Sequence, residues 1–168
     1  GYKWLMGPYS LGVAVFGKRF LDAEPLVHNW IARENSQDFA NLVNYRDEFQ
    51  PGARRFDVGE RSNFVLMPML TAALKQVLEW GPTAVQDYCQ QLGEQLEGLL
   101  NGSHFRMTSA SERAAHLFGI RNIDHAALPS IQRKLERHNV YVSLRGDAVR
   151  VSPHLYNDEA DIAALAEA

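Results

Sequence analysis

The stretch that restricts the possible folds most is a long run of apolar residues at helical spacing, broken once by Gly81-Pro82. Pro68 suits the start of the first helix, because the amide hydrogen that proline lacks would be unpaired there. Asn101-Gly102 suits the end of the second helix. The apolar stripes comprise Leu70, Ala73, Leu74, Val77 and Leu78 in the first helix and Val85, Tyr88, Cys89, Leu92, Leu96 and Leu99 in the second. We therefore predict a long helical arm that is kinked at Gly81-Pro82.

The residues after this arm alternate between strand and helix patterns. Two strand-like runs precede a helix with Pro129 near its start, and two further runs flank the tight turn Arg145-Gly146-Asp147. Asn157 can cap a last helix whose acidic first turn suits the helix dipole. The expected strands are 104–109, 116–121, 140–144 and 148–152, and the expected helix between them is 128–138. This order predicts a compact α+β domain of roughly 70 residues with an antiparallel sheet.

The first third of the chain has a weaker pattern. Residues 11–16 (LGVAVF) are almost all apolar and are surrounded by glycines and a proline, which is typical of a strand buried on both faces of an α/β sheet. Such a strand needs neighbours on both sides. From Phe20 to Asp57 the pattern has no clear period, and we expect loops with one short helix near 38–45.

Composition and charge exclude several classes of function. The hydrophobic fraction of 46% and the charged fraction of 22% are ordinary for a globular protein. A net charge of −3 gives no electrostatic reason to expect nucleic acid or an anionic membrane as a partner. The single cysteine, Cys89, excludes an internal disulfide and fits a cytoplasmic location. No metal site is expected, because none of the histidines has ligand spacing: His28, His104, His116, His125, His138 and His154.

Lys3 is the first candidate for a chemical role. It lies between Tyr2 and Trp4 and precedes a turn at Gly7-Pro8 and the apolar run 11–16. Most lysines near a chain end are simply solvated. Here the context favours a semi-apolar niche at the edge of a sheet, where desolvation favours the free amine that forms a Schiff base.

Arg150 is the second candidate. Alternation along 148–152 puts Val149 and Val151 on one side of a strand and Arg150 with Ser152 on the other. The simplest interpretation is an arginine on the solvent face of a sheet. The functional interpretation is a guanidinium fork on a rigid strand, which holds a carboxylate at two points.

The polar stretch 53–64 (ARRFDVGERSNF) is the third candidate. Its charges, a glycine and small polar residues precede the expected start of the helical arm. A loop with surface ion pairs is the common case. The functional alternative is a loop that meets a phosphate or another subunit.

Taken together and in order, three segments resemble the C-terminal part of the class V aminotransferases, which are pyridoxal-phosphate enzymes of fold type I. GYKWLMGPYSLGVAVF resembles the lysine motif, RRFDVGERSNF the stretch before the inter-domain helix, and VRVSPHLYNDEADI the small-domain signature. The resemblance implies that Lys3 forms a Schiff base with pyridoxal 5'-phosphate and that Arg150 holds the carboxylate of an amino-acid substrate. It also implies that the full-length parent is a homodimer.

The resemblance implies a division of the chain as well. Residues 1–63 match a remnant of the α/β cofactor-binding large domain, 64–101 the connecting helices and 102–168 the α+β small domain. The first residues then correspond to the middle of a longer enzyme, so we expect a fragment. We expect it to have negligible transaminase activity alone. We also expect self-association or disorder of its first third, because unpaired strand edges attract partners.

Two departures from the family pattern narrow these expectations. Cysteine desulfurases that resemble this chain need a nucleophilic cysteine on a small-domain loop, and the matching turn Arg145-Gly146-Asp147 has none, which disfavours a desulfurase. Many relatives have Gly-Thr-Pro where this chain has Gly59-Glu60-Arg61. Their threonine contacts the cofactor phosphate of the partner subunit, and here that role passes to Arg61, Ser62 or Asn63 or is absent.

The reaction itself is left open. The stretch VSLRGDAVRVSPHLYN looks closer to the kynureninase-like and epimerase-like branches of the family. Four reactions therefore remain possible: transamination, elimination, carbon–carbon cleavage and epimerisation. The alternative from another class is a non-catalytic fragment that is only a folded small domain.

Overall fold

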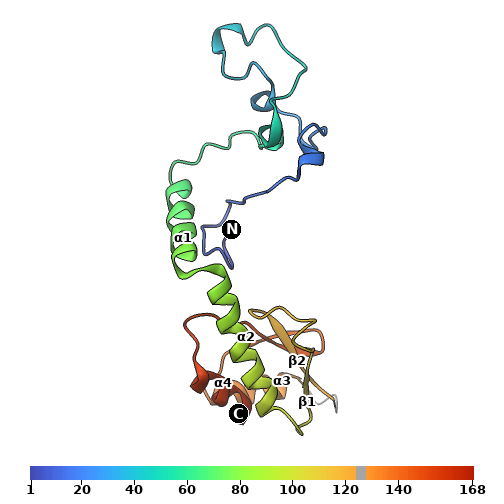
Figure 1. Cartoon of the computed structure of the whole chain (residues 1–168), viewed down its shortest axis with the longest axis vertical. Coiled ribbons are helices and arrows are strands. Elements are labelled where there is room, and N and C mark those ends of the chain that lie inside the picture. Colours follow the sequence, from blue (N-terminus) through green and yellow to red (C-terminus); the bar gives the residue numbers. More distant parts are fainter. Residues whose placement is uncertain (124–127) are drawn as a thin grey trace. The chain divides into compact units, whose positions relative to one another are not determined.

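The computed structural model describes residues 1–123 and 128–168, so one of the six histidines considered above, His125, lies outside the described residues. The described chain divides into two units, residues 1–76 and 77–168. Figure 1 shows the helices and strands of the chain.

The predicted pair of consecutive helices is confirmed (Figure 1). Gly81 separates them with a φ of +80°, in the left-handed region that favours glycine, and Pro82 opens the second helix where no amide hydrogen is needed. The first helix begins at Leu66, two residues before the predicted start at Pro68. The reason is a cap, since the side chain of Asn63 accepts a hydrogen bond of 2.8 Å from Leu66 N. The α-helices of the described residues are α1 (Leu66–Trp80), α2 (Pro82–Leu99), α3 (Leu128–Arg137) and α4 (Glu159–Glu167).

The predicted antiparallel sheet of the C-terminal unit is confirmed, and its four strands lie in the order β1-β2-β4-β3. Its strands are β1 (Phe105–Met107), β2 (Phe118–Asn122), β3 (Ser143–Arg145) and β4 (Ala148–Val151). Each overlaps a predicted run, although β3 begins three residues late. The reason is that Val140 N donates to Leu135 O and closes the end of α3 instead of pairing with β4. The turn between β3 and β4 places Gly146 at a φ of +57°.

The helices of this unit pack on one face of the sheet. Val149 and Val151 of β4 are buried on that face, which confirms the predicted alternation, and α2 runs across it (Figure 1). Each fully buried leucine on α2 contributes about 1.5–3 kcal/mol to stability. The buried cluster comprises Leu92, Leu96, Leu100, Phe118, Ile120, Leu135, Val149, Val151 and Ile162.

The N-cap of α4 is Asp158, so the predicted cap at Asn157 is wrong by one residue. The Asp158 carboxylate accepts hydrogen bonds from Ala160 N and Asp161 N, and the Asp161 carboxylate accepts one from Asp158 N. This reciprocal arrangement satisfies more amides than a single cap does. Asn157 instead accepts a hydrogen bond from His154 N and stabilises the preceding turn.

The N-terminal unit has little regular structure besides α1. The predicted strand at 11–16 is wrong: these residues form no strand, and Val13 and Val15 are 62% and 94% exposed. A strand of this kind needs hydrogen-bonded neighbours on both sides, and the described residues supply none. The short helix expected near 38–45 is reduced to a 3-10 turn at Phe39–Asn41.

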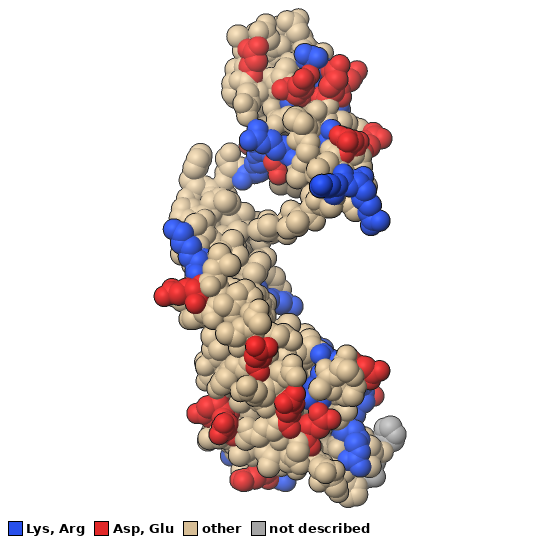
Figure 2. Space-filling model, in the orientation of Figure 1, with Lys and Arg blue, Asp and Glu red and all other residues tan. Residues whose placement is uncertain are grey.

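Two features organise the irregular part of this unit. Gln50 is buried and its side chain donates hydrogen bonds of 2.8 Å to Ser36 Oγ and Ile31 O. The rings of Phe16 and Phe56 stack with centroids 4.2 Å apart. Along α1 the surface is mostly apolar, because Lys75 and Glu79 are the only charged residues of the helix (Figure 2).

The α2 stripe allows a matched test of the core. We expect Leu96→Ala to lower the free energy of unfolding of the C-terminal unit by about 2–5 kcal/mol, because Leu96 is fully buried and its truncation leaves a cavity. Leu99→Ala on the same helix should change it by less than about 0.5 kcal/mol, since Leu99 is half exposed. Urea unfolding followed by circular dichroism measures both values, and equal losses would contradict this packing.

Candidate functional site

Arg150 lies in the middle of β4, on the face of the sheet opposite the helices. Its strand neighbours are Gly119 on β2 and Ser143 on β3, both directly opposite in register. Both have small side chains, so the strands themselves crowd the guanidinium little. The arginine is therefore held on a central strand whose other face is anchored in the core.

The side chain of Arg150 is half-buried and incompletely satisfied. Its Nε is buried and has no hydrogen-bond partner among the described residues. Leaving such a donor unpaired costs about 1–3 kcal/mol. Arg150 lines a hollow of about 750 Å³. The side chains around it include His138, Tyr141, Ser143, Tyr156 and Asp161.

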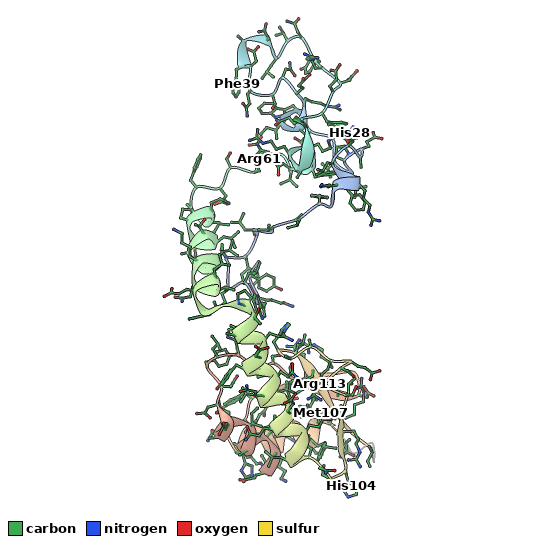
Figure 3. The ribbon with its side chains drawn as sticks, viewed as in Figure 1. His28, Phe39, Arg61, His104, Met107 and Arg113 are labelled. Atoms are coloured by element: carbon green, nitrogen blue, oxygen red, sulfur yellow. The ribbon has the colours of Figure 1, made fainter. Side chains whose placement is uncertain are left out.

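Arg113 provides a contrast within the same unit. Its side chain is 5% exposed, and its Nη1 donates to Glu97 Oε2 at 2.8 Å and to Thr108 O at 2.7 Å (Figure 3). The Glu97 carboxylate compensates the charge of this arginine, and its hydrogen bonds tie a loop to α2. A structural role accounts for Arg113, whereas no such pairing accounts for Arg150.

Lys3 lies in a turn rather than at a sheet edge. Met6 N donates to Lys3 O at 2.8 Å, and no strand follows at 11–16, so the predicted semi-apolar niche is not formed. The side chain is exposed, and Nζ lies 5.6 Å from the centroid of the Tyr2 ring. Tyr2 itself stacks on Tyr9, with centroids 4.2 Å apart. The amine is thus accessible to a carbonyl compound.

The residues expected near a phosphate line a second hollow, of about 1030 Å³, in the N-terminal unit. Asn63 lines it, but its side-chain oxygen caps α1. Arg61 also lines it, and its Nη1 is bonded to the Asp57 carboxylate, which compensates the charge (Figure 3). Ser62 is exposed there, so its hydroxyl is accessible, and Arg54 adds a further cation to the lining.

Cys89 is fully buried on α2. Its Sγ donates to Pro153 O at 3.5 Å. Burial raises the pKa of the Cys89 thiol, which disfavours the thiolate that a nucleophile requires. This cysteine therefore serves as a small core residue.

The described residues fit parts of a pyridoxal-phosphate site. Lys3 offers an accessible amine for the aldehyde, Ser62 a hydroxyl for a phosphate, and Arg150 an unsatisfied guanidinium for a carboxylate. The two units are described separately, with Lys3 and Ser62 in one and Arg150 in the other.

Sequence reasoning did not single out the other arginines of the sheet. Arg121 and Arg145 lie on strands that pair with β4, on the same face as Arg150. The signal that could have found them is the two-residue alternation of each strand, but reading it requires the register between strands.

No family model matches the chain, and no curated protein matches it. Several solved structures have a similar fold. The cysteine desulfurase CsdA from Escherichia coli has a TM-score of 0.72 and 17% identity over 97% of this chain and 42% of its own. A cysteine desulfurase from Thermococcus onnurineus has a TM-score of 0.72 and 18% identity, and the match covers 97% of this chain and 43% of that one. The cystine C-S lyase C-DES has a TM-score of 0.58 and 24% identity, and the match covers 73% of this chain and 33% of that one.

These likenesses show the fold of the chain. The predicted combination, part of a fold type I large domain with connecting helices and an α+β domain carrying an antiparallel sheet, is confirmed. The chain spans less than half the length of the structures that it matches.

No group of three or more histidine, cysteine or acidic side chains among the described residues could hold a metal ion. None of the helices described is both long and apolar enough to cross a membrane.

The buried state of Cys89 predicts low reactivity. We expect an aromatic disulfide reagent to modify it about a hundredfold more slowly in the folded chain than in urea, because reaction requires opening of the core. The matched control is Cys89→Ser/Gln90→Cys, which moves the thiol to an exposed position on α2. Equal rates for the two folded proteins would contradict burial.

Proposed function

We propose that this chain contributes the reactive lysine and the substrate-binding arginine of a pyridoxal-phosphate enzyme that acts on an amino acid. The observation that carries the proposal is Arg150, whose buried Nε lacks a partner beside a hollow on a chain with this fold. Desulfurases, a C-S lyase and a structure with glycine linked to a pyridoxal-phosphate cofactor share the fold.

In this proposal each residue has a separate role. Arg150 binds the substrate carboxylate through two N–H groups and so orients the α-carbon. Lys3 binds the cofactor and then, as a free amine, removes and returns a proton at the α-carbon of the substrate. Ser62 donates to the phosphate, with Asn63 holding the start of α1 behind it. The cofactor, when bound, supplies an electron sink.

We propose transamination as the reaction, from the resemblance of the lysine and arginine motifs, in a cytoplasmic homodimer of the longer parent. A lyase is the second candidate, because a cystine C-S lyase is among the structures of similar fold. A mechanism that uses Cys89 as nucleophile is disfavoured in either case, because the thiol is buried.

The lysine assignment is tested by trapping. The chain is incubated with pyridoxal phosphate, reduced with borohydride and mapped by peptide mass spectrometry. We expect one predominant adduct, on Lys3, and its loss in Lys3→Arg, while Lys18, Lys75 and Lys134 stay unlabelled. Labelling spread evenly over these lysines would contradict a role for Lys3 in this chain.

The reaction is tested separately. We expect the isolated chain to have negligible transaminase activity, because Lys3 is exposed in a turn and the described residues of its unit place no strand beside it. Steady-state assays with a panel of amino acids and an oxo-acid acceptor measure this. Robust turnover by the pure chain would refute the expectation.

A further inference from the structure

The outer face of the sheet, defined as the face opposite the helices, carries a concentration of arginines. Antiparallel register places Arg121 opposite Ala148, Arg145 opposite Ala148 from the other side, and Arg150 two residues further along β4. Residues two apart on a strand share a face, so all three arginines project from the same side. Arg106 on β1 is opposite Arg121 and belongs to the same face.

Small residues form the floor between these arginines. Gly119 and Ser143 flank Arg150, and Ala148 lies between Arg121 and Arg145. A Cβ at position 119 would approach the Ala148 Cβ to 3.2 Å, so the floor is closely packed at this point. Long basic side chains thus surround a floor of small residues.

The charges on this face are not equally compensated. Arg121 Nε donates to both carboxylate oxygens of Asp147, at 3.2 and 3.1 Å, which neutralises that acid. Arg145 Nη1 donates to Leu144 O at 2.7 Å, a neutral carbonyl. In the part of the chain that the structure describes, no ion pair joins a carboxylate to Arg145 or Arg150. The acid in the hollow beside Arg150, Asp161, is engaged in the cap of α4.

Arg106 Nη1 likewise donates to neutral carbonyls, those of Ser103 and Phe105. Among the cations of this face without a carboxylate partner in the described residues, Arg145 and Arg150 lie at diagonal positions of neighbouring strands. Diagonal strand positions lie about 7–8 Å apart at their Cα atoms, and arginine side chains can close or widen that distance. This spacing suits two carboxylates of one small molecule, because a single carboxylate occupies one guanidinium fork.

We propose that the substrate of this site is an acidic amino acid, whose α-carboxylate binds Arg150 and whose side-chain carboxylate binds Arg145. The proposal rests on the proposed function, which assigns the first carboxylate to Arg150, and adds the second anchor. Arg121 acts as a positioning residue, because it holds Asp147 away from Arg145.

The test measures binding by the full chain without cofactor. L-Glutamate and L-glutamine serve as probes, since they have the same shape and differ in side-chain charge. Binding is followed through the amide resonance of Gly119, which lies directly across from Arg150, at constant ionic strength. We expect glutamate to bind about two- to fivefold more tightly than glutamine, which corresponds to the upper part of the range for an exposed ion pair.

The variants separate the two anchors. Arg145→Gln should make the two affinities equal without changing that of glutamine, and Arg145→Lys should restore part of the preference. Arg150→Gln should weaken both ligands. Arg121→Gln should reduce the preference, because Asp147 is then free to pair with Arg145. The control, Arg133→Gln on the exposed side of α3, should change neither affinity.

Each outcome bears on one proposal. If glutamate and glutamine bind equally, and Arg150→Gln weakens both, the acidic substrate is overturned while the role of Arg150 stands. If Arg133→Gln lowers the glutamate preference as much as Arg145→Gln does, the preference reflects overall charge and the proposal is again overturned. If neither ligand binds, the carboxylate assignment of Arg150 fails with it, independently of the labelling result at Lys3.

Discussion

Burial of the α2 stripe against the sheet is the interaction on which the rest of the C-terminal unit depends. Leu92 and Leu96 are almost completely inaccessible and pack with residues of β2 and β4. Because strand side chains alternate, the face that receives α2 determines which residues occupy the other face. A shift of β4 by one residue would bury Arg150 and expose Val149 and Val151, at a large cost in desolvation. The apolar contacts on the helical face of the sheet thus determine that the arginines lie on the opposite face.

This coupling explains why a functional role for Arg150 is compatible with a stable fold. The core on the helical face carries the stability, so the outer face can leave a buried donor without a partner. Such unsatisfied groups are rare in native proteins and occur at strained or functional positions or where a water or ion completes them. Arg113 differs from Arg150, because its guanidinium donates hydrogen bonds to the Glu97 carboxylate and to the backbone carbonyl of Thr108. These bonds hold a loop in place.

The N-terminal unit lacks an equivalent constraint. Among the described residues its apolar segment 11–16 has no strand partners and exposes two valines. Lys3 lies in a turn that is held by two backbone hydrogen bonds, from Met6 N to Lys3 O and from Gly7 N to Gly1 O. The hydrogen bonds of Gln50 organise a local loop cluster rather than a layered core. The structures of similar fold are more than twice as long as this chain.

Local patterns in the sequence were sufficient for the elements that make their own hydrogen bonds. The helices on either side of Gly81 followed from apolar spacing, a glycine and a proline, and the β3–β4 hairpin followed from its turn. The same patterns misplaced the cap of α4, because Asn157 and Asp158 are nearly equivalent caps and only the reciprocal bond with Asp161 distinguishes them. They also predicted a strand at 11–16, where composition is suitable but pairing is absent.

What the sequence determined by itself is therefore the set of helices and strands in the C-terminal two-thirds, the alternation along β4, and two residue types suited to an amine and a carboxylate-binding role. Tertiary structure alone decided which arginines share a face, which of them are compensated, and that Cys89 is buried. The physical reason is that periodicity is a property of one segment, whereas register, desolvation and charge pairing are properties of two segments brought together.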